Sequence, residues 1–141
     1  AAFLGIRESR RITAEYKLVK DDILGYRKFE DGIARSNYPL DIHGGESDDE
    51  LFYSHAEAVE RFFEIPFRSM IAAGVDNLIV AGRCIGTDFL AQSTIRIQQT
   101  CRAMGEAAAY AAKLAVSDGL PFKEVNGVRV RQMMRNKGAK L

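Results

Sequence analysis

The clearest pattern of hydrophobic and polar positions along this chain lies between residues 76 and 115. Leu78–Ala81 is a short apolar run without alternation, which predicts a strand that is covered on both faces. The preceding Asp76-Asn77 pair predicts a turn. Gly82 ends the run, at a point where the backbone must turn or approach another group closely. The pattern therefore predicts a buried strand that leads into a glycine turn.

A long helix is predicted next, because small and apolar residues recur every three or four positions. The face predicted to be buried comprises Ile97, Cys101, Met104, Gly105, Ala108, Ala111, Ala112 and Ala115. A face of such small residues lets the helix axis lie close to a neighbouring layer, and Gly105, which costs a helix about 1 kcal/mol, is expected to need that closeness. Ser93 and Thr94 are good capping residues and favour a start near Thr94. The N-terminus of this helix can face an anion, but a strand–loop–helix unit without any ligand fits the spacing equally well.

The remainder of the chain is predicted to form shorter elements. The patterns predict strands at 12–18, 33–36 and 38–43, a helix after Asp21 as its cap, an acidic loop at 44–50, a short helix at 54–61 and an extended segment at 62–71 with a bend at Pro66. Asp118-Gly119 is expected to end the long helix ahead of Pro121. A last helix, at about 125–135, is predicted to place Val128, Met133 and Met134 inward and Arg129, Arg131, Gln132 and Arg135 outward.

Composition narrows the classes of function. A chain of 141 residues suits one domain or two small lobes that share a core. The net charge of +1, from 20 basic and 19 acidic residues, argues against a nucleic-acid-binding surface. No apolar run approaches the ~20 residues of a membrane span. Cys84 and Cys101 show no C-x-x-C spacing, and His43 and His55 do not complete a zinc site, so two reduced thiols are favoured over a redox pair.

Four blocks of residues carry a resemblance to a known family. They are GIRESRRI (residues 5–12), YPLDIH (residues 38–43), FEIPFRSMI (residues 63–71) and VAGRCIG followed by STIRIQQTCRAMGEAA. In this order the blocks resemble the C-terminal part of the FAD-dependent oxidoreductase family related to the succinate dehydrogenase/fumarate reductase flavoproteins. The family's nucleotide-binding fingerprint, G-x-G-x-x-G after a strand, does not occur in this chain. The resemblance therefore implies a C-terminal fragment of a larger flavoprotein.

The resemblance also implies a fold and a set of partners. The expected class is α/β, or α+β for the chain in isolation, with residues 1–74 in a substrate-side lobe and residues 75–141 forming the last strand and helices of a Rossmann-like FAD-binding domain. The implied cofactor is FAD, bound by the full-length parent and not by the fragment alone. The implied partners are the missing N-terminal nucleotide-binding half and a small-molecule substrate. Alanine-rich area near Ala103, Ala107, Ala108 and Ala111 is then expected to be exposed, or covered by another chain through self-association.

Candidate site residues follow from the same resemblance. It implies flavin contacts by Gly82, Arg83, Cys84 and Arg96, and by the backbone amides of Ile97, Gln98 and Gln99. This places the start of the long helix near Gln98, with 93–96 as an approach loop, and we adopt that later start. His43, whose ordinary pKa of about 6.5 suits proton transfer, is a candidate catalytic residue, as is Arg10. A structural histidine, and a solvated arginine rim that includes Arg10, remain open alternatives.

A second functional class remains open from the sequence. An independent, non-enzymatic α+β interaction module without a cofactor would also lack the glycine fingerprint. The gene upstream of this chain distinguishes the two, because only the flavoenzyme requires a strand–G-x-G-x-x-G–helix unit there. The substrate, the electron partner and the cellular compartment do not follow from the sequence.

Overall fold

A computed structural model describes residue 5, residues 8–40 and residues 61–141 of the chain. Its elements, in chain order, are α1 (Lys20–Leu24), β1 (Gly32–Ser36), β2 (Phe63–Pro66), the 3-10 turn η2 (Phe67–Met70), α3 (Phe89–Ile95), α4 (Gln98–Asp118), the 3-10 turn η3 (Phe122–Glu124) and α5 (Gly127–Asn136). This combination of helices with one small antiparallel sheet is an α+β fold, as expected for the chain in isolation.

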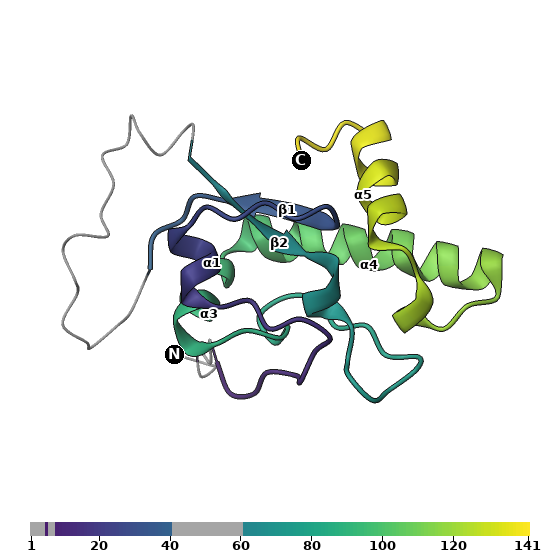
Figure 1. The fold of residues 1–141 in the computed structure, drawn as a ribbon, viewed down its shortest axis with the longest axis horizontal. Coiled ribbons are helices and arrows are strands. Elements are labelled where there is room, and N and C mark those ends of the chain that lie inside the picture. Colours follow the sequence, from purple (N-terminus) through teal and green to yellow (C-terminus); the bar gives the residue numbers. More distant parts are fainter. Residues whose placement is uncertain (1–4, 6–7, 41–60) are drawn as a thin grey trace.

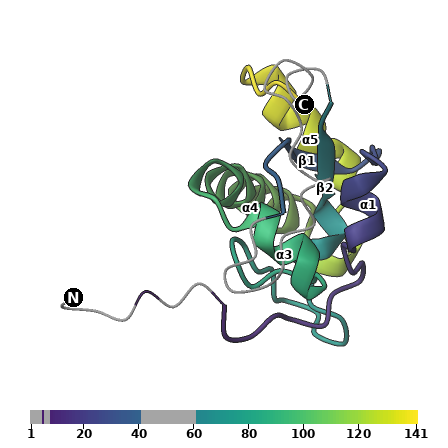
Figure 2. The ribbon, with the colours of Figure 1, turned by 90° about the vertical axis from the view of Figure 1, so that its left-hand side faces the viewer.

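Two strands form the centre of the molecule. β1 pairs antiparallel with β2, placing Arg35 opposite Glu64 and Ser36 opposite Phe63. α4 packs against β1 and α1 packs against β2, so the strands lie between these two helices, as Figures 1 and 2 show. α5 contacts both α4 and β1. One continuous apolar core, with members from Leu18 to Met134, joins the sheet to α3, α4 and α5.

The predicted buried strand at Leu78–Ala81 is wrong. Leu78 is 43% exposed, Ala81 is also exposed, and Ile79 forms a single isolated bridge, to Ile71. A strand covered on both faces requires a partner strand on each edge and a layer on each face. Within the described residues, this run lies along Met70–Ala72 and gains no second edge. The turn predicted at Asp76-Asn77 is confirmed.

The start of the long helix is confirmed, because α4 begins at Gln98 with Ile97 as its N-cap. The alternative start at Thr94 is wrong, and so is the interpretation of 93–96 as a loop. Ser93 and Thr94 lie buried in the last turns of α3. Their hydroxyls donate to the carbonyl oxygens of Leu90 and Ala91, three residues back, so they do not cap a following helix.

The buried face of α4 matches the predicted one at Met104 and Ala111 and differs elsewhere. The buried positions are Thr100, Met104, Ala107, Ala111 and Leu114. Gly105 is exposed, and a Cβ placed there would meet nothing within 4 Å. Ala107 and Ala111, expected at an uncovered surface, are 0% exposed against the chain's own core, whereas Ala103 and Ala108 are half-buried. β1 and α5 pack against α4, and the side that they cover carries Met104 and Leu114.

α5 departs from its predicted orientation at two positions. Val128 is 46% exposed and not inward, and the Arg131 side chain is only 12% exposed and not outward. Met134 is buried as predicted, and Met133 is half-buried. Arg131 points inward because Glu64 of β2 lies there, 2.8 Å from its guanidinium. A buried carboxylate requires such a partner, and this requirement outweighs the apolar pattern of the helix, which predicted an outward Arg131.

Shorter elements confirm some predictions and correct others. β1 and β2 occur where strands were predicted, and the chain turns into η2 directly after Pro66. Gly119 ends α4 in the left-handed conformation, at φ 67°. α1 is capped at Val19 through the Asp22 carboxylate, so Asp21 as cap is wrong. Residues 12–18 form isolated bridges and no continuous strand. Residues 38–40 form no strand, and the rest of the predicted strand at 38–43, the predicted loop at 44–50 and all but residue 61 of the predicted helix at 54–61 lie outside the described residues.

Candidate functional site

The glycine turn after Ala81 takes a backbone conformation that favours glycine. Gly82 has φ 95°, in the left-handed region, and a Cβ there would stand 4.0 Å from the sulfur of Cys101 on α4. The turn is anchored at Gly86, whose amide donates to the Ser69 carbonyl at 2.8 Å. A side chain at Gly86 would collide with the Cβ of Ala14. The turn is therefore held between the N-terminal segment and α4.

A hydrogen bond joins this turn to the start of α4. Nε of Arg83 donates to the backbone carbonyl of Arg96, 3.2 Å away. α4 begins two residues later without a side-chain cap, and Gln98 and Gln99 at its start are exposed. The first amides of a helix have no partner within the helix and carry the positive end of its dipole. The structure thus brings the glycine turn, Arg83 and the N-terminus of α4 together, and their role at a flavin stays a prediction.

Thr100, in the first turn of α4, forms hydrogen bonds to backbone carbonyls at the helix start. Its buried hydroxyl donates to the Ile97 carbonyl at 2.9 Å and also contacts the Ile95 carbonyl. These bonds satisfy carbonyl groups in the tight connection between α3 and α4. The Ile95 and Ile97 carbonyls are thus paired within the chain, while the first residues of α4, Gln98 and Gln99, are exposed.

Both cysteines lie near Arg83, since Cys84 follows it in the chain and its charge acts on Cys101. Cys84 is exposed, Cys101 is half-buried, and both thiols are free. Burial raises the pKa of the Cys101 thiol, the positive charge of Arg83 lowers it and Cys84 raises it, leaving it raised overall. Cys101 is therefore protonated near neutral pH and packs as a small apolar group.

Of the two candidate catalytic residues, Arg10 and His43, the structure describes only Arg10. Arg10 is exposed, on a segment that reaches the glycine turn through a 2.9 Å hydrogen bond from the Ile12 amide to the Cys84 carbonyl. His43 lies outside the described residues. The structure thus brings the Arg10 segment to the turn, and the roles of both residues stay predictions.

A separate open cleft of about 800 Å³ lies between the loop before β1, η2 and the start of α5. Two guanidinium groups flank the Tyr16 ring beside it, that of Arg27 at 5.8 Å and that of Arg68 at 5.2 Å from the ring centre. Each has its own carboxylate, Asp22 for Arg27 at 2.8 Å and Asp31 for Arg68 at 3.0 Å. The charges of Arg27 and Arg68 are compensated for this reason. Arg68 and Asp31 are 37 positions apart, so no local sequence pattern indicates their pairing, whereas Arg27 and Asp22 are only five positions apart.

Tyr16 connects the two ion pairs at this cleft. Its hydroxyl donates to the Asp22 carboxylate at 2.8 Å, and Nη1 of Arg27 donates to the hydroxyl oxygen. Burial and the bond to Asp22 raise the pKa of Tyr16 above its ordinary value of 10.0. A phenol with a raised pKa stays protonated, which suits a structural donor better than a general base at neutral pH.

Two classes of site find no support in the described part of the chain. Its His, Cys, Asp and Glu side chains form no cluster of three or more that would suit a metal ion. None of its helices combines the length and the apolar character needed to span a membrane. The arrangement with the clearest chemistry is the uncapped start of α4 beside Arg83, which can hold an anionic or strongly polarised oxygen.

The sequence model of a family described as FAD dependent oxidoreductase matches residues 1–134, nearly the whole chain. No curated protein and no solved structure matches.

Proposed function

Because this chain belongs to the FAD dependent oxidoreductase family, we propose that it is the C-terminal part of a flavoenzyme and supplies one wall of its flavin site. The observation that carries the proposal is the hydrogen bond from Arg83 to the Arg96 carbonyl, which ties the glycine turn to the start of α4. In this proposal residues 75–141 belong to a Rossmann-like FAD-binding domain, and residues 1–74 belong to the substrate side.

The chemistry of the residues fits the cofactor. Gly82 allows close approach of the backbone, and the Arg83 guanidinium suits a pyrophosphate or the polar ribityl chain. Arg96 and the amides of Ile97, Gln98 and Gln99 suit the oxygen-rich pyrimidine end of the flavin ring. The two arginines carry positive charges and the three amides are hydrogen-bond donors, as an electron-rich ligand requires.

The bound flavin itself supplies the hydride chemistry of such an enzyme. The task of this chain is to orient the ring and stabilise the negative charge that reduction adds to it. The dipole of α4, whose axis extends over the 21 residues of Gln98–Asp118, contributes positive potential at its start. Arg10 and His43 are the proposed substrate-side residues.

Reading the gene upstream tests whether the chain is part of a larger flavoprotein. We expect a strand, a G-x-G-x-x-G motif and a helix ahead of residue 1, since the family binds its dinucleotide through that unit. A start codon directly ahead of this chain would contradict the proposal and favour an independent interaction module.

Substitutions in the full-length parent test the residue roles. Arg83→Ala should mainly weaken FAD retention, and Gly82→Val should block it by adding a branched side chain at the turn. Arg96→Ala should retain more FAD but lower its reduction potential, because a positive charge near the developing anion is lost. FAD occupancy and reduction potential are the two measurements. Lys113→Ala, on the exposed middle of α4, is the matched control that leaves both unchanged. Wild-type occupancy and potential in both arginine variants would show that these assignments are wrong.

A further inference from the structure

Two positive charges share one aromatic ring beside the sheet. Nζ of Lys28 lies 3.0 Å from the centre of the Phe62 ring, and the guanidinium carbon of Arg35 lies 5.0 Å from it. Lys28 precedes β1, Arg35 belongs to it, and both side chains are exposed. Nζ of Lys28 also donates to the Phe62 carbonyl. The ring and this carbonyl hold the two like charges close together although they repel each other.

No carboxylate neutralises this pair among the residues that the structure describes. Glu64, the carboxylate that acts on Lys28, is already committed elsewhere. Its Oε1 accepts from Arg131 at 2.8 Å, and its Oε2 accepts from Arg131 at 2.9 Å and from the Phe29 amide at 2.8 Å. The negative charge of Glu64 is therefore balanced by Arg131, and the pair at the Phe62 ring keeps its excess positive charge.

The pKa of Lys28 reflects its burial and the charges around it. Partial burial lowers its pKa, Glu64 raises it and Arg35 lowers it, with a net lowering from the ordinary value of 10.5. An anion between Lys28 and Arg35 would relieve that repulsion. It would also replace water that the ammonium group has lost against the ring.

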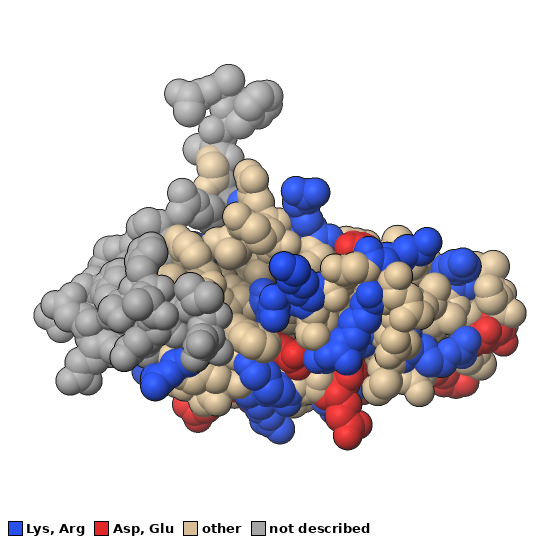
Figure 3. Space-filling model, turned by 90° about the horizontal axis from the view of Figure 1, so that it is seen from above, with Lys and Arg blue, Asp and Glu red and all other residues tan. Residues whose placement is uncertain are grey.

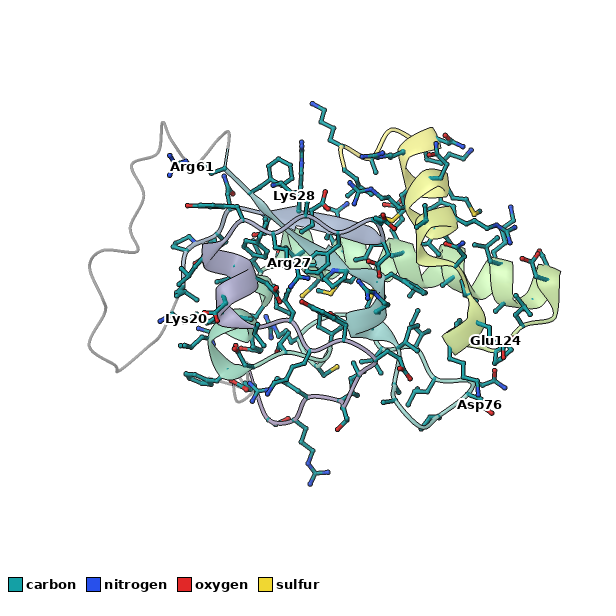
Figure 4. All side chains as sticks on the ribbon, in the orientation of Figure 1. Lys20, Arg27, Lys28, Arg61, Asp76 and Glu124 are labelled. Atoms are coloured by element: carbon teal, nitrogen blue, oxygen red, sulfur yellow. The ribbon has the colours of Figure 1, made fainter. Side chains whose placement is uncertain are left out.

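The contrast with the cleft beside Tyr16 makes the Lys28–Arg35 pair distinctive. There, too, two cations approach one ring, but Arg27 and Arg68 each bind a carboxylate directly. Lys28 and Arg35 also share one aromatic ring, but neither forms an ion pair with a carboxylate of the described residues. Figure 4 shows Lys28 well apart from the acidic Asp76 and Glu124. Figure 3 looks onto the molecule from above, where Lys and Arg side chains spread over the middle of the face.

We propose that Lys28, Arg35 and the Phe62 ring form a binding site for an oxyanion, the phosphate or carboxylate group of a small ligand. The guanidinium of Arg35 offers paired N–H donors that match two oxygens of such a group, and Lys28 adds a point charge and further donors. Phe62 keeps both cations in place. This site uses none of the residues assigned to the flavin, so it stands or falls independently of the proposed function.

Titration with two probes tests the site. Inorganic phosphate and malonate are added separately to the ¹⁵N-labelled 141-residue chain, with chloride adjusted to keep the ionic strength constant. Backbone amide signals of Lys28, Arg35 and Phe62 should shift and saturate. Saturation by phosphate alone identifies a phosphate ligand, and saturation by malonate alone identifies a carboxylate. Saturation by both supports a general oxyanion site.

Variants decide whether the pair is responsible. Lys28→Gln and Arg35→Gln should each weaken binding by about tenfold, the loss expected for one charge-assisted hydrogen bond. Lys28→Arg should retain it, and Lys113→Gln, an exposed lysine on α4, is the control that leaves the affinity unchanged. Circular dichroism spectra verify that each variant is folded. Shifts that never saturate, or that chloride reproduces, would overturn the proposal, as would equal affinity in all variants.

Discussion

At the scale of single residues, the ion pair between Arg131 and Glu64 is the interaction on which most of the surrounding structure depends. The guanidinium also donates to the carbonyls of Phe29 and Gly32, at 2.8 and 3.0 Å. A Cβ at Gly32 would collide with both partners of the pair. α5, β2 and the loop before β1 therefore meet at one guanidinium, which joins residues 67 positions apart.

We predict that Arg131→Met lowers the free energy of unfolding by about 3 kcal/mol, because a buried carboxylate is left without its partner. Urea unfolding measures the loss. The double variant Glu64→Gln with Arg131→Met should recover part of it, since no charge then remains buried. A double variant as unstable as the sum of both single variants would contradict this account, because it would show no coupling.

The same pair predicts a dependence of stability on pH. Burial is the largest influence on Glu64 and raises its pKa, but the bonds from Arg131 and the Phe29 amide outweigh it and leave the pKa below the ordinary 4.5. A pKa lowered by folding contributes stability that is present above about pH 4.5 and is lost as the pH falls through the folded value.

In Arg131→Met the lowering influences that remain are the Phe29 amide bond and the charge of Lys28, the smallest of the causes, so burial should raise the pKa of Glu64 above 4.5. The contribution of this residue then reverses sign, and stability falls as the pH rises through the new value. Unfolding in urea between pH 3 and pH 7 checks both curves, with Lys113→Met as the control. An unchanged pH dependence in Arg131→Met would show that another group controls the loss of stability at low pH.

At the scale of single elements, the helices differ in whether a side chain caps the free backbone amides at their start. Asn126 caps α5, with its side-chain oxygen 2.9 Å from the Val128 amide and 3.4 Å from the Arg129 amide. α4 has no side-chain cap at Ile97 despite being twice as long. The difference agrees with separate roles, a closed structural end for α5 and an open end for α4 that a ligand can occupy.

We predict that Asn126→Ala lowers the free energy of unfolding by about 1 kcal/mol, whereas Asn126→Asp preserves it, since aspartate caps equally well. Asn136→Ala at the other end of α5 removes only a surface bond to Gln132 and should cost less than about 0.5 kcal/mol. Thermal or urea unfolding measures all three variants. Equal losses for Asn126→Ala and Asn136→Ala would argue against the capping role.

At the scale of the whole molecule, the outward side of α4 is the surface that the fold leaves open. Gly105 and Ala109 are exposed, and Val116 is 85% exposed near the C-terminal end of the helix. Ala107 and Ala111, by contrast, pack inside the core. Self-association or a nucleotide-binding half could cover the outward side, and both remain predictions.

A glycine substitution tests whether that side is open. In the chain alone, Gly105→Ala should stabilise by about 0.5–1 kcal/mol, because alanine favours the helix and its Cβ meets nothing within 4 Å. Gly119→Ala is the contrasting control and should destabilise by about 1 kcal/mol, because Gly119 has φ 67°. Both values come from urea unfolding. Destabilisation by Gly105→Ala in the chain alone would show that another copy already covers this face.

Features that depend on residues close together in sequence were predictable. The turn at Asp76-Asn77, the left-handed end of α4 at Gly119 and the strand β1 all occur where the local residues favour them. The family blocks also located the start of α4 at Gln98, where capping propensity alone favoured Thr94. The same blocks implied flavin contacts by Gly82, Arg83 and Arg96, which stay predictions; the hydrogen bond between Arg83 and the Arg96 carbonyl is a finding of the structure.

The tertiary structure alone decided the features that join distant residues. Along α4 most positions are small, so hydrophobicity barely distinguishes one face from another, and the packing of β1 and α5 selected the side of Met104 and Leu114. In the part of the chain that the structure describes, Leu78–Ala81 has no neighbouring strands that would turn an apolar run into a buried one. Arg131 points inward only because Glu64, far away in sequence, is buried beside it. Strand pairing, helix rotation and buried charge depend on partners that local sequence does not specify.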